Sequence, residues 1–209
     1  MKKILFLITS LILTVILLFL FIPEKFQEYK SNHNFKTQVS DDWIIFTKNT
    51  IGTNTKELEE KAKDTFGMDK KLISDVKKSA LELSHEYLFY KDKSSDIHDS
   101  ITVFAASFEK ENLSQKVTKF CEKLPEYLNS DPFVKIHLTL NYCKLQSINN
   151  IQTITYSYQN KDDNKKVKNI QYEFNTKTKR VGMGINCGYD KCDDIQEDAE
   201  KMIEKIEFL

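Results

Sequence analysis

Two cysteines stand close together in "NCGYDKCDD", residues 186–194, where Cys187 and Cys192 flank a predicted turn. Such a pair could bind a metal, act as a redox switch or form a disulfide. Zinc requires a complete set of Cys or His ligands, usually two closely spaced pairs, and the other cysteines, Cys121 and Cys143, are far apart. A helix N-terminus at Cys192 would stabilise a thiolate, but the spacing is not C-x-x-C. We therefore predict a disulfide that joins the last strand to the last helix.

The histidines are candidates for catalysis. His98 lies with Asp96, Asp99 and Ser100 in "SSDIHDS", and these are the residue types of a hydrolase or a metal site. Neighbouring residues in a turn point in different directions, however, and catalytic triads are assembled from distant segments, so a solvated turn is the favoured interpretation. His137 alternates with apolar residues of a predicted strand. An envelope hydrolase that acts through His98 or His137 is the alternative to a binding function.

Aromatic residues are the candidates for binding. Trp43 opens a predicted strand, and Tyr156 and Tyr158 alternate with polar residues in another. Together these side chains could line a binding groove, although aromatic residues in strands more often form the core of a sheet. Both interpretations follow from the same pattern.

No motif for a cofactor or a metal occurs. Residues 190–198 are rich in Asp and Glu, but the alternating spacing of a calcium loop is absent, and acidic side chains are favourable at the start of a helix. Arg180 is the only arginine, and the 31 basic and 31 acidic residues balance. A nucleic-acid partner is therefore not expected. We expect no cofactor, no metal and no catalytic residue.

The N-terminus indicates where the protein is located. Residues 4–23 contain no charged residue and are long enough to cross the hydrocarbon core of a membrane. No small-residue cleavage site follows, so we predict an uncleaved signal anchor, with an atypical cleaved signal as the alternative. The lysines in residues 1–3 would hold the N-terminus in the cytoplasm. Residues 24–34 are predicted to be a polar tether, and residues 35–209 an exported domain on the periplasmic or extracellular side.

Four cysteines in an exported domain are expected to form disulfides. More than one complete pairing is possible, and we predict the bonds Cys187–Cys192 and Cys121–Cys143. The second bond requires the helix that carries Cys121 to cover the strand face that carries Cys143. If the helix lies elsewhere, Cys121 is a small buried hydrophobic residue.

The hydrophobic pattern predicts the elements that position these residues. Two short strands are expected within residues 35–49. A helix capped by Asn54 or Thr55 follows, and then a second helix that contains Leu72 and Leu83. A strand hairpin around the "KSSDIHD" turn leads to an amphipathic helix over residues 112–132.

The second half of the sequence alternates between apolar and polar residues with a period of two, which predicts strands with one packed face. Short charged turns join these strands into an antiparallel meander. The final stretch, residues 193–209, has an apolar stripe typical of a helix. The fold class is therefore α+β, an antiparallel sheet of about six to seven strands packed with helices. The four strands are predicted at residues 134–142, 151–159, 169–175 and 180–186.

The order of these elements resembles that of the PsbP-like superfamily, which includes the extrinsic photosystem II subunit and many exported bacterial domains. The resemblance rests on that order, on "FKTQVSDDW" at residues 35–43 and on "AEKMIEKIEF" at residues 199–208, and it covers residues 35–209. Members are mostly accessory or adaptor proteins without a ligand, so the resemblance implies a role without catalysis. It transfers no site residues.

The sequence therefore predicts a single-pass membrane protein whose exported domain binds a partner protein or an envelope component. An immunity-type protein that neutralises an exported toxin is a further alternative. Membrane association is expected through residues 4–23.

Overall fold

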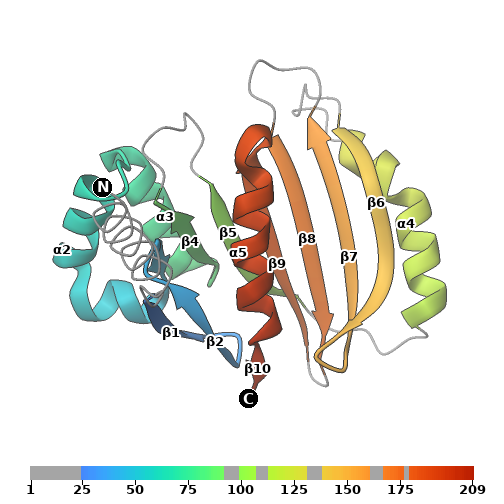
Figure 1. Cartoon of the computed structure of the whole chain (residues 1–209), viewed down its shortest axis with the longest axis horizontal. Helices are drawn as coiled ribbons and strands as arrows, with labels where there is room; N and C mark the ends of the chain where they lie inside the picture. Colours follow the sequence, from blue (N-terminus) through green and yellow to red (C-terminus); the bar gives the residue numbers. More distant parts are fainter. Residues whose placement is uncertain (1–24, 92–98, 107–112, 131–137, 161–166, 177–178) are drawn as a thin grey trace, which may run out of the picture.

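A computed structural model of the chain describes residues 25–91, 99–106, 113–130, 138–160, 167–176 and 179–209. These residues form a seven-stranded sheet, a three-stranded sheet and four α-helices (Figure 1). Within these ranges no helix is both long and apolar enough to cross a membrane. The predicted anchor, residues 4–23, lies outside the described residues and stays a prediction.

The seven-stranded sheet is antiparallel and has the strand order β3-β4-β5-β9-β8-β7-β6. Strands β6 to β9 form the predicted meander, and the pairing of β5 with β9 joins them to the earlier strands. The predicted α+β class and antiparallel sheet are confirmed. The strands are β3 (Trp43–Phe46), β4 (Glu86–Tyr90), β5 (Ser100–Ala106), β6 (Leu138–Ile148), β7 (Ile151–Asn160), β8 (Val167–Asn175) and β9 (Arg180–Gly188).

Strand β6 continues past the end predicted for it at Tyr142. Asn149 and Asn150 have φ angles of 50° and 61° and form a two-residue turn between the paired residues Ile148 and Ile151. Asparagine tolerates positive φ, which such a turn requires. The hairpin is therefore longer than its hydrophobic pattern predicted.

Helix α5 (Cys192–Glu204) covers one face of the sheet, which we call the covered face (Figure 1). Odd-numbered residues of β9, such as Met183 and Ile185, are fully buried there against the apolar stripe of the helix, which includes Ala199 and Met202. The stripe is the one predicted from the helical spacing, so burial of this face explains why the helix forms here.

Three helices lie on the opposite face. Helices α2 (Lys48–Asp64) and α3 (Lys70–Glu82) enclose a second core with β3 and β4, and α4 (Leu113–Asn129) packs on β6. Helix α2 begins earlier than predicted because Thr47 caps it in a capping box with Thr50, whereas Asn54 lies at a kink.

The predicted tether differs from the structure, because β1 (Phe26–Ser31) lies within residues 24–34. It pairs with β2 (Phe35–Ser40), which pairs in turn with β10 (Glu207–Phe208) to complete the three-stranded sheet. Tyr29 and Ser31 are buried in this sheet. Their hydroxyls can be buried without a large cost because both donate hydrogen bonds to the carboxylate of Glu86. The tether prediction is therefore wrong for these residues.

Candidate functional site

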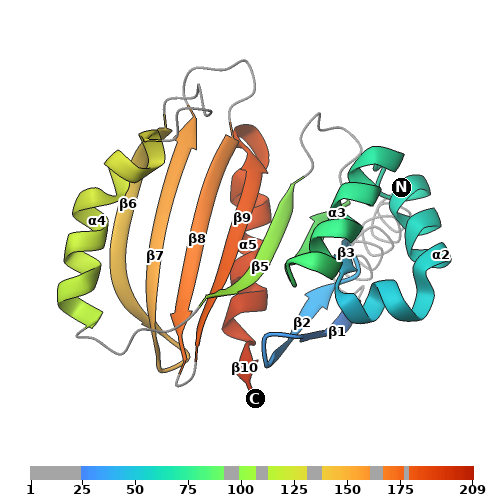
Figure 2. The same cartoon turned by 180° about the vertical axis from the view of Figure 1, so that it is seen from behind.

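The middle of the sheet has a second surface, opposite α5, between the helices that cover its two ends (Figure 2). Even-numbered residues of β9 point to this side, and the strand registers bring polar and aromatic residues of β5, β8 and β7 beside them. Most of these side chains are partly exposed. We call this surface the polar face. Its residues are Thr102, Phe104, Tyr156, Tyr158, Asn169, Gln171, Glu173, Arg180, Gly182, Gly184 and Asn186.

An ion pair lies on the polar face near the end of β8 and the start of β9. The only arginine of the chain, Arg180, donates a hydrogen bond from Nη1 to Oε2 of Glu173 over 3.1 Å, and the hydroxyl of Tyr156 donates to Oε1 of Glu173 over 3.2 Å. Glu173 is only 7% exposed. Burial, and then the charge of Glu173, raise the pKa of Tyr156. Tyr156 therefore remains protonated and acts as a hydrogen-bond donor rather than as a base.

Two glycines allow large side chains to lie flat on the polar face. A Cβ atom at Gly182 would be 2.2 Å from the ring of Phe104, and one at Gly184 would be 2.5 Å from the side-chain amide of Gln171. The ring and the amide therefore rest directly on the backbone of β9. Their positions are fixed by the sheet, which gives the polar face a preorganised shape.

The composition of the polar face is typical of a protein-binding surface. Tyrosine, phenylalanine and arginine are enriched where proteins bind one another, because each combines a large contact area with limited flexibility or several donors. Tyr156 and Tyr158 stack with ring centroids 6.4 Å apart, and burial raises the pKa of Tyr158. Phe120 of α4 supports Tyr156 with an edge-to-face contact at 5.5 Å.

The structure separates the three predicted binding aromatics. Trp43 is 2% exposed on the covered face, where its indole N–H donates to Asp198 over 3.0 Å. Tyr156 and Tyr158 lie on the polar face. The sequence analysis missed Glu173, Gln171, Phe104 and Arg180 as members of a common surface, although the polar positions of the alternating pattern contained the signal.

Both predicted disulfides are present. Cys121 of α4 is bonded to Cys143 of β6 with a Cα–Cα distance of 5.5 Å, so the helix covers the strand face that the prediction required. Cys187 of β9 is bonded to Cys192 at the start of α5, with a Cα–Cα distance of 5.1 Å. All four cysteines are therefore occupied in structural bonds, and none is available as a metal ligand or redox switch in this state.

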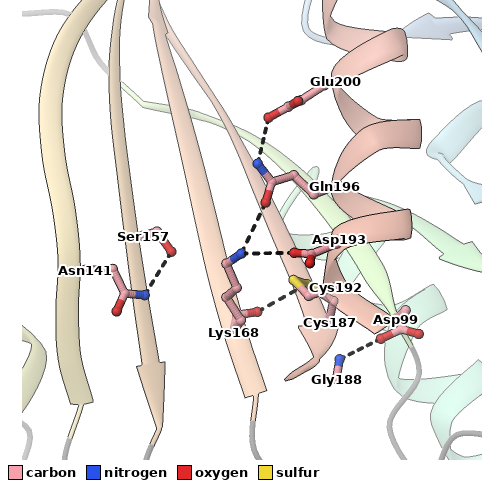
Figure 3. Close-up of a disulfide and its surroundings, with 10 residues drawn as sticks. All are labelled: Asp99, Asn141, Ser157, Lys168, Cys187, Gly188, Cys192, Asp193, Gln196 and Glu200. Atoms are coloured by element: carbon pink, nitrogen blue, oxygen red, sulfur yellow. Dashed lines mark hydrogen bonds and ion pairs between the residues drawn. A yellow bond between two sulfur atoms is a disulfide. The ribbon is translucent and has the colours of Figure 1, made fainter. Parts of the chain in front are cut away.

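Polar contacts reinforce the second disulfide (Figure 3). The ammonium of Lys168 on β8 donates to Gln196 over 3.2 Å and pairs with Asp193 over 3.8 Å, which links the strand to α5. The backbone N–H of Gly188 donates to the carboxylate of Asp99 over 2.8 Å. Asp99 is 1% exposed, so this member of the "SSDIHDS" group has a structural position.

The candidate catalytic residues are not brought together by the described part of the chain. His98, Asp96 and His137 lie outside the described residues. Among the residues that the structure describes, no group of three or more His, Cys, Asp or Glu side chains is placed to hold a metal ion.

No protein-family model matches the sequence, and a search of curated protein sequences finds no relative. The structure is similar to the solution structure of cyanobacterial PsbP from Synechocystis, with a TM-score of 0.55 and 9% identity over 90% of this chain and 94% of that chain. Two weaker matches each cover 88% of this chain. LpqN, involved in cell envelope biogenesis of Mycobacterium tuberculosis, has a TM-score of 0.46 and 10% identity over 89% of its own length.

The other weak match is the type VI secretion immunity protein TplEi of Pseudomonas aeruginosa, solved with the "L" peptide, with a TM-score of 0.46 and 6% identity over 98% of that chain. TM-scores this low do not establish a common fold. The match to cyanobacterial PsbP does, and it agrees with the resemblance found in the order of the elements. The chain therefore has a PsbP-like fold.

Proposed function

We propose that this protein is an exported, non-catalytic binding domain that is held at the membrane by residues 4–23 and binds a partner protein through the polar face. The observation that carries the proposal is the polar face itself, with its preorganised aromatic rings, amides and ion pair. Interfaces of this composition gain affinity from large, rigid side chains and specificity from oriented polar groups.

The chemistry of the polar face favours binding over catalysis. Both carboxylate oxygens of Glu173 accept hydrogen bonds, one from Arg180 and one from Tyr156, so this residue holds the two side chains in place. Tyr156 is held in its protonated form by burial. The described residues of the polar face include no Ser or Cys nucleophile paired with a base, as covalent catalysis would need.

One feature supports an exported location, and another places the domain close to the membrane. Disulfides persist in oxidising compartments outside the cytoplasm, and this domain has two. The anchor would end at residue 23 and strand β1 begins at Phe26, which leaves a very short connection. The domain would then stay close to the outer surface of the membrane, where the partner must also be accessible.

Site-specific photocrosslinking in the native cells tests the proposal. We would replace Phe104 of the full chain with p-benzoylphenylalanine, and in a matched variant replace Tyr189, which is 49% exposed and outside the polar face. A discrete protein adduct from position 104 alone is expected. No adduct, or the same adducts from both positions, would contradict binding through the polar face.

The hydrolase alternative makes a different prediction for the same cells. If His98 or His137 were catalytic, alanine at that position would abolish an activity while folding and the adduct from position 104 stayed intact. In a binding domain neither substitution removes the function.

A further inference from the structure

Strand β6 is an edge of the seven-stranded sheet, and among the described residues no strand pairs with its outer side. An edge strand presents a row of backbone N–H and C=O groups that can pair with another chain. At eleven residues β6 is also long for an edge, whereas the opposite edge, β3, has four residues. The question is therefore which backbone groups of β6 face outward and what lies beside them.

The turn between β6 and β7 determines the orientation of the backbone groups. A two-residue turn closes on a hydrogen-bonded pair, here Ile148 and Ile151, and hydrogen-bonded pairs alternate along an antiparallel ladder. The backbone groups of Ser147, Leu145 and Cys143 therefore point away from β7. Their side chains lie on the face where α4 packs, since Cys143 is bonded to the helix.

At the start of β6, the side-chain amide of Asn129 already pairs with the outward backbone groups of Leu138. Asn129, the last residue of α4, accepts a hydrogen bond from the backbone N–H of Leu138 over 2.9 Å and donates one to the Leu138 carbonyl over 3.0 Å. A neighbouring strand would make the same pair of bonds. The irregularity between Leu140 and Tyr142 shifts the alternation by one residue, which is why both Leu138 and Cys143 face outward.

A groove runs beside the remaining open part of the edge. It has a volume of about 570 Å³ and is lined by Val117, Thr118, Cys121 and Glu122 of α4 and by Cys143, Lys144 and Leu145 of β6. Figures 1 and 2 both show α4 alongside the outer side of β6, and the Cys121–Cys143 bond fixes the spacing between them. The groove is thus bounded by a helix on one side and, on the other, by outward backbone groups of β6 that pair with no strand of the described residues.

We propose that Cys143–Ser147 binds an extended segment of a partner protein as an added antiparallel β-strand, beside β6 in the plane of the sheet. Strand addition obtains affinity from backbone hydrogen bonds and specificity from alternate side chains. Residues of the segment that face α4 would be apolar, to pack on Val117 and Leu145, and the exposed Glu122 and Lys144 would pair with polar or charged residues elsewhere in the segment. This surface is separate from the polar face and does not depend on it.

The position of α4 favours a single strand over a second copy of the chain. Two copies paired through β6 by a two-fold axis would present identical surfaces to each other. Each α4 would then meet the α4 of the other copy on the same face of the sheet, beside the joined strands. A lone extended segment avoids this collision.

Amide hydrogen exchange of the full chain in detergent tests the proposal with a defined probe, the peptide acetyl-KTVTVTVTK-amide. If the peptide adds antiparallel to β6 with its valines facing α4, the valine N–H groups point to β6, because directly opposed residues of an antiparallel pair share a face and exchange their hydrogen bonds. The peptide is expected to slow exchange across residues 143–147 by about tenfold. A peptide N-methylated at the valines should lose this effect, and one N-methylated at the threonines should retain it.

The variant Leu145→Pro removes one outward N–H without removing a bond to β7, and Leu145→Ala is its matched control. The proline variant is expected to bind the peptide about tenfold more weakly than the alanine variant. If the proline variant does not fold, the comparison of the valine-methylated and threonine-methylated peptides on the unaltered protein still tests the proposal. No protection, equal protection by both methylated peptides, or protection that appears without peptide as dimers form would overturn the proposal. The Phe104 adduct is unaffected by Leu145→Pro, so failure of this site and failure of the polar face are distinguishable.

Discussion

The two sides of strand β9 differ in what they do, although they alternate residue by residue. On the covered face, Val181, Met183 and Ile185 are completely buried beneath α5. On the polar face, Arg180 and Asn186 are partly exposed and two glycines hold no side chain of their own. The first side stabilises the fold by removing apolar surface from water.

The difference teaches that the polar face is not simply an unfinished core. Larger residues at Gly182 and Gly184 would displace Phe104 and Gln171, so the glycines determine how those side chains lie. A surface whose only role is to be solvated does not need this arrangement. In the proposed function, stability belongs to the covered face and recognition to the polar face, and the following experiments test that division.

The largest effect is expected from a change in the core. Met183→Ala should lower the free energy of unfolding by about 2–5 kcal/mol, because it leaves a cavity beneath α5. Asn186→Ala, on the other side of the same strand, should change it by no more than about 0.5 kcal/mol. Urea unfolding of the full chain measures both. Equal losses would show that the two sides contribute alike to stability.

A second pair of variants compares carboxylates. Glu86 is fully buried and accepts hydrogen bonds from Tyr29, Ser31 and the N–H of Asn32, so Glu86→Gln should cost about 2 kcal/mol. Glu173→Gln on the polar face should cost about 1 kcal/mol, because Arg180 is partly exposed and the amide oxygen of the glutamine can still accept a hydrogen bond from Arg180 or Tyr156. Thermal unfolding provides the comparison. A greater loss from Glu173→Gln would place a stabilising role on the polar face.

A third test concerns the flat packing of Phe104. Gly182→Ala should destabilise the protein by about 1–2 kcal/mol, because the ring must move away from the new methyl group. In the background of Phe104→Ala, the same Gly182→Ala change should cost much less, since the clash is gone. A double-mutant cycle in urea measures the coupling. Additive losses would mean that the two residues do not act together.

The smallest effect is expected at His33, which is 7% exposed. Burial lowers the pKa of His33, and the charge of Glu86 opposes this only in part. The unfolded chain then binds the proton more readily, so the contribution of His33 to stability is complete above its ordinary pKa of about 6.5 and is lost as the pH falls below that value. His33→Gln should flatten the decline of unfolding free energy in mildly acidic solution. Parallel curves for the two proteins would contradict this assignment.

Much of the fold was predictable because its second half alternates in polarity. Polar and apolar residues alternate through most of β7, β8 and β9, and a period of two indicates strands with one packed face. In β7 the polar members, Thr153, Thr155 and Ser157, are the ones buried on the covered face. The stripe of α5 and both disulfides followed from spacing and compartment. These are local signals, which a sequence contains in full.

The elements that depend on distant partners were not predictable. Strand β1 has a polar sequence, and its buried residues are satisfied by Glu86, far away in the chain. The polar face was also not predictable, because its residues come from strands whose neighbours the sequence does not reveal. Alternation indicates that β8 and β9 have a polar side, but only the strand order shows that Glu173, Arg180 and Tyr156 meet there.

The three-stranded sheet joins the two ends of the described chain. Phe35 of β2 pairs with Phe208 of β10, and the N–H of Leu209 donates to the carbonyl of Asn34 over 2.9 Å. Ribosomes make the chain from its N-terminus, so β2 exists long before its partner does. This small sheet therefore ties the closing of β2 to a late stage of synthesis, because the edge that β10 covers has to wait until Glu207 and Phe208 have been made.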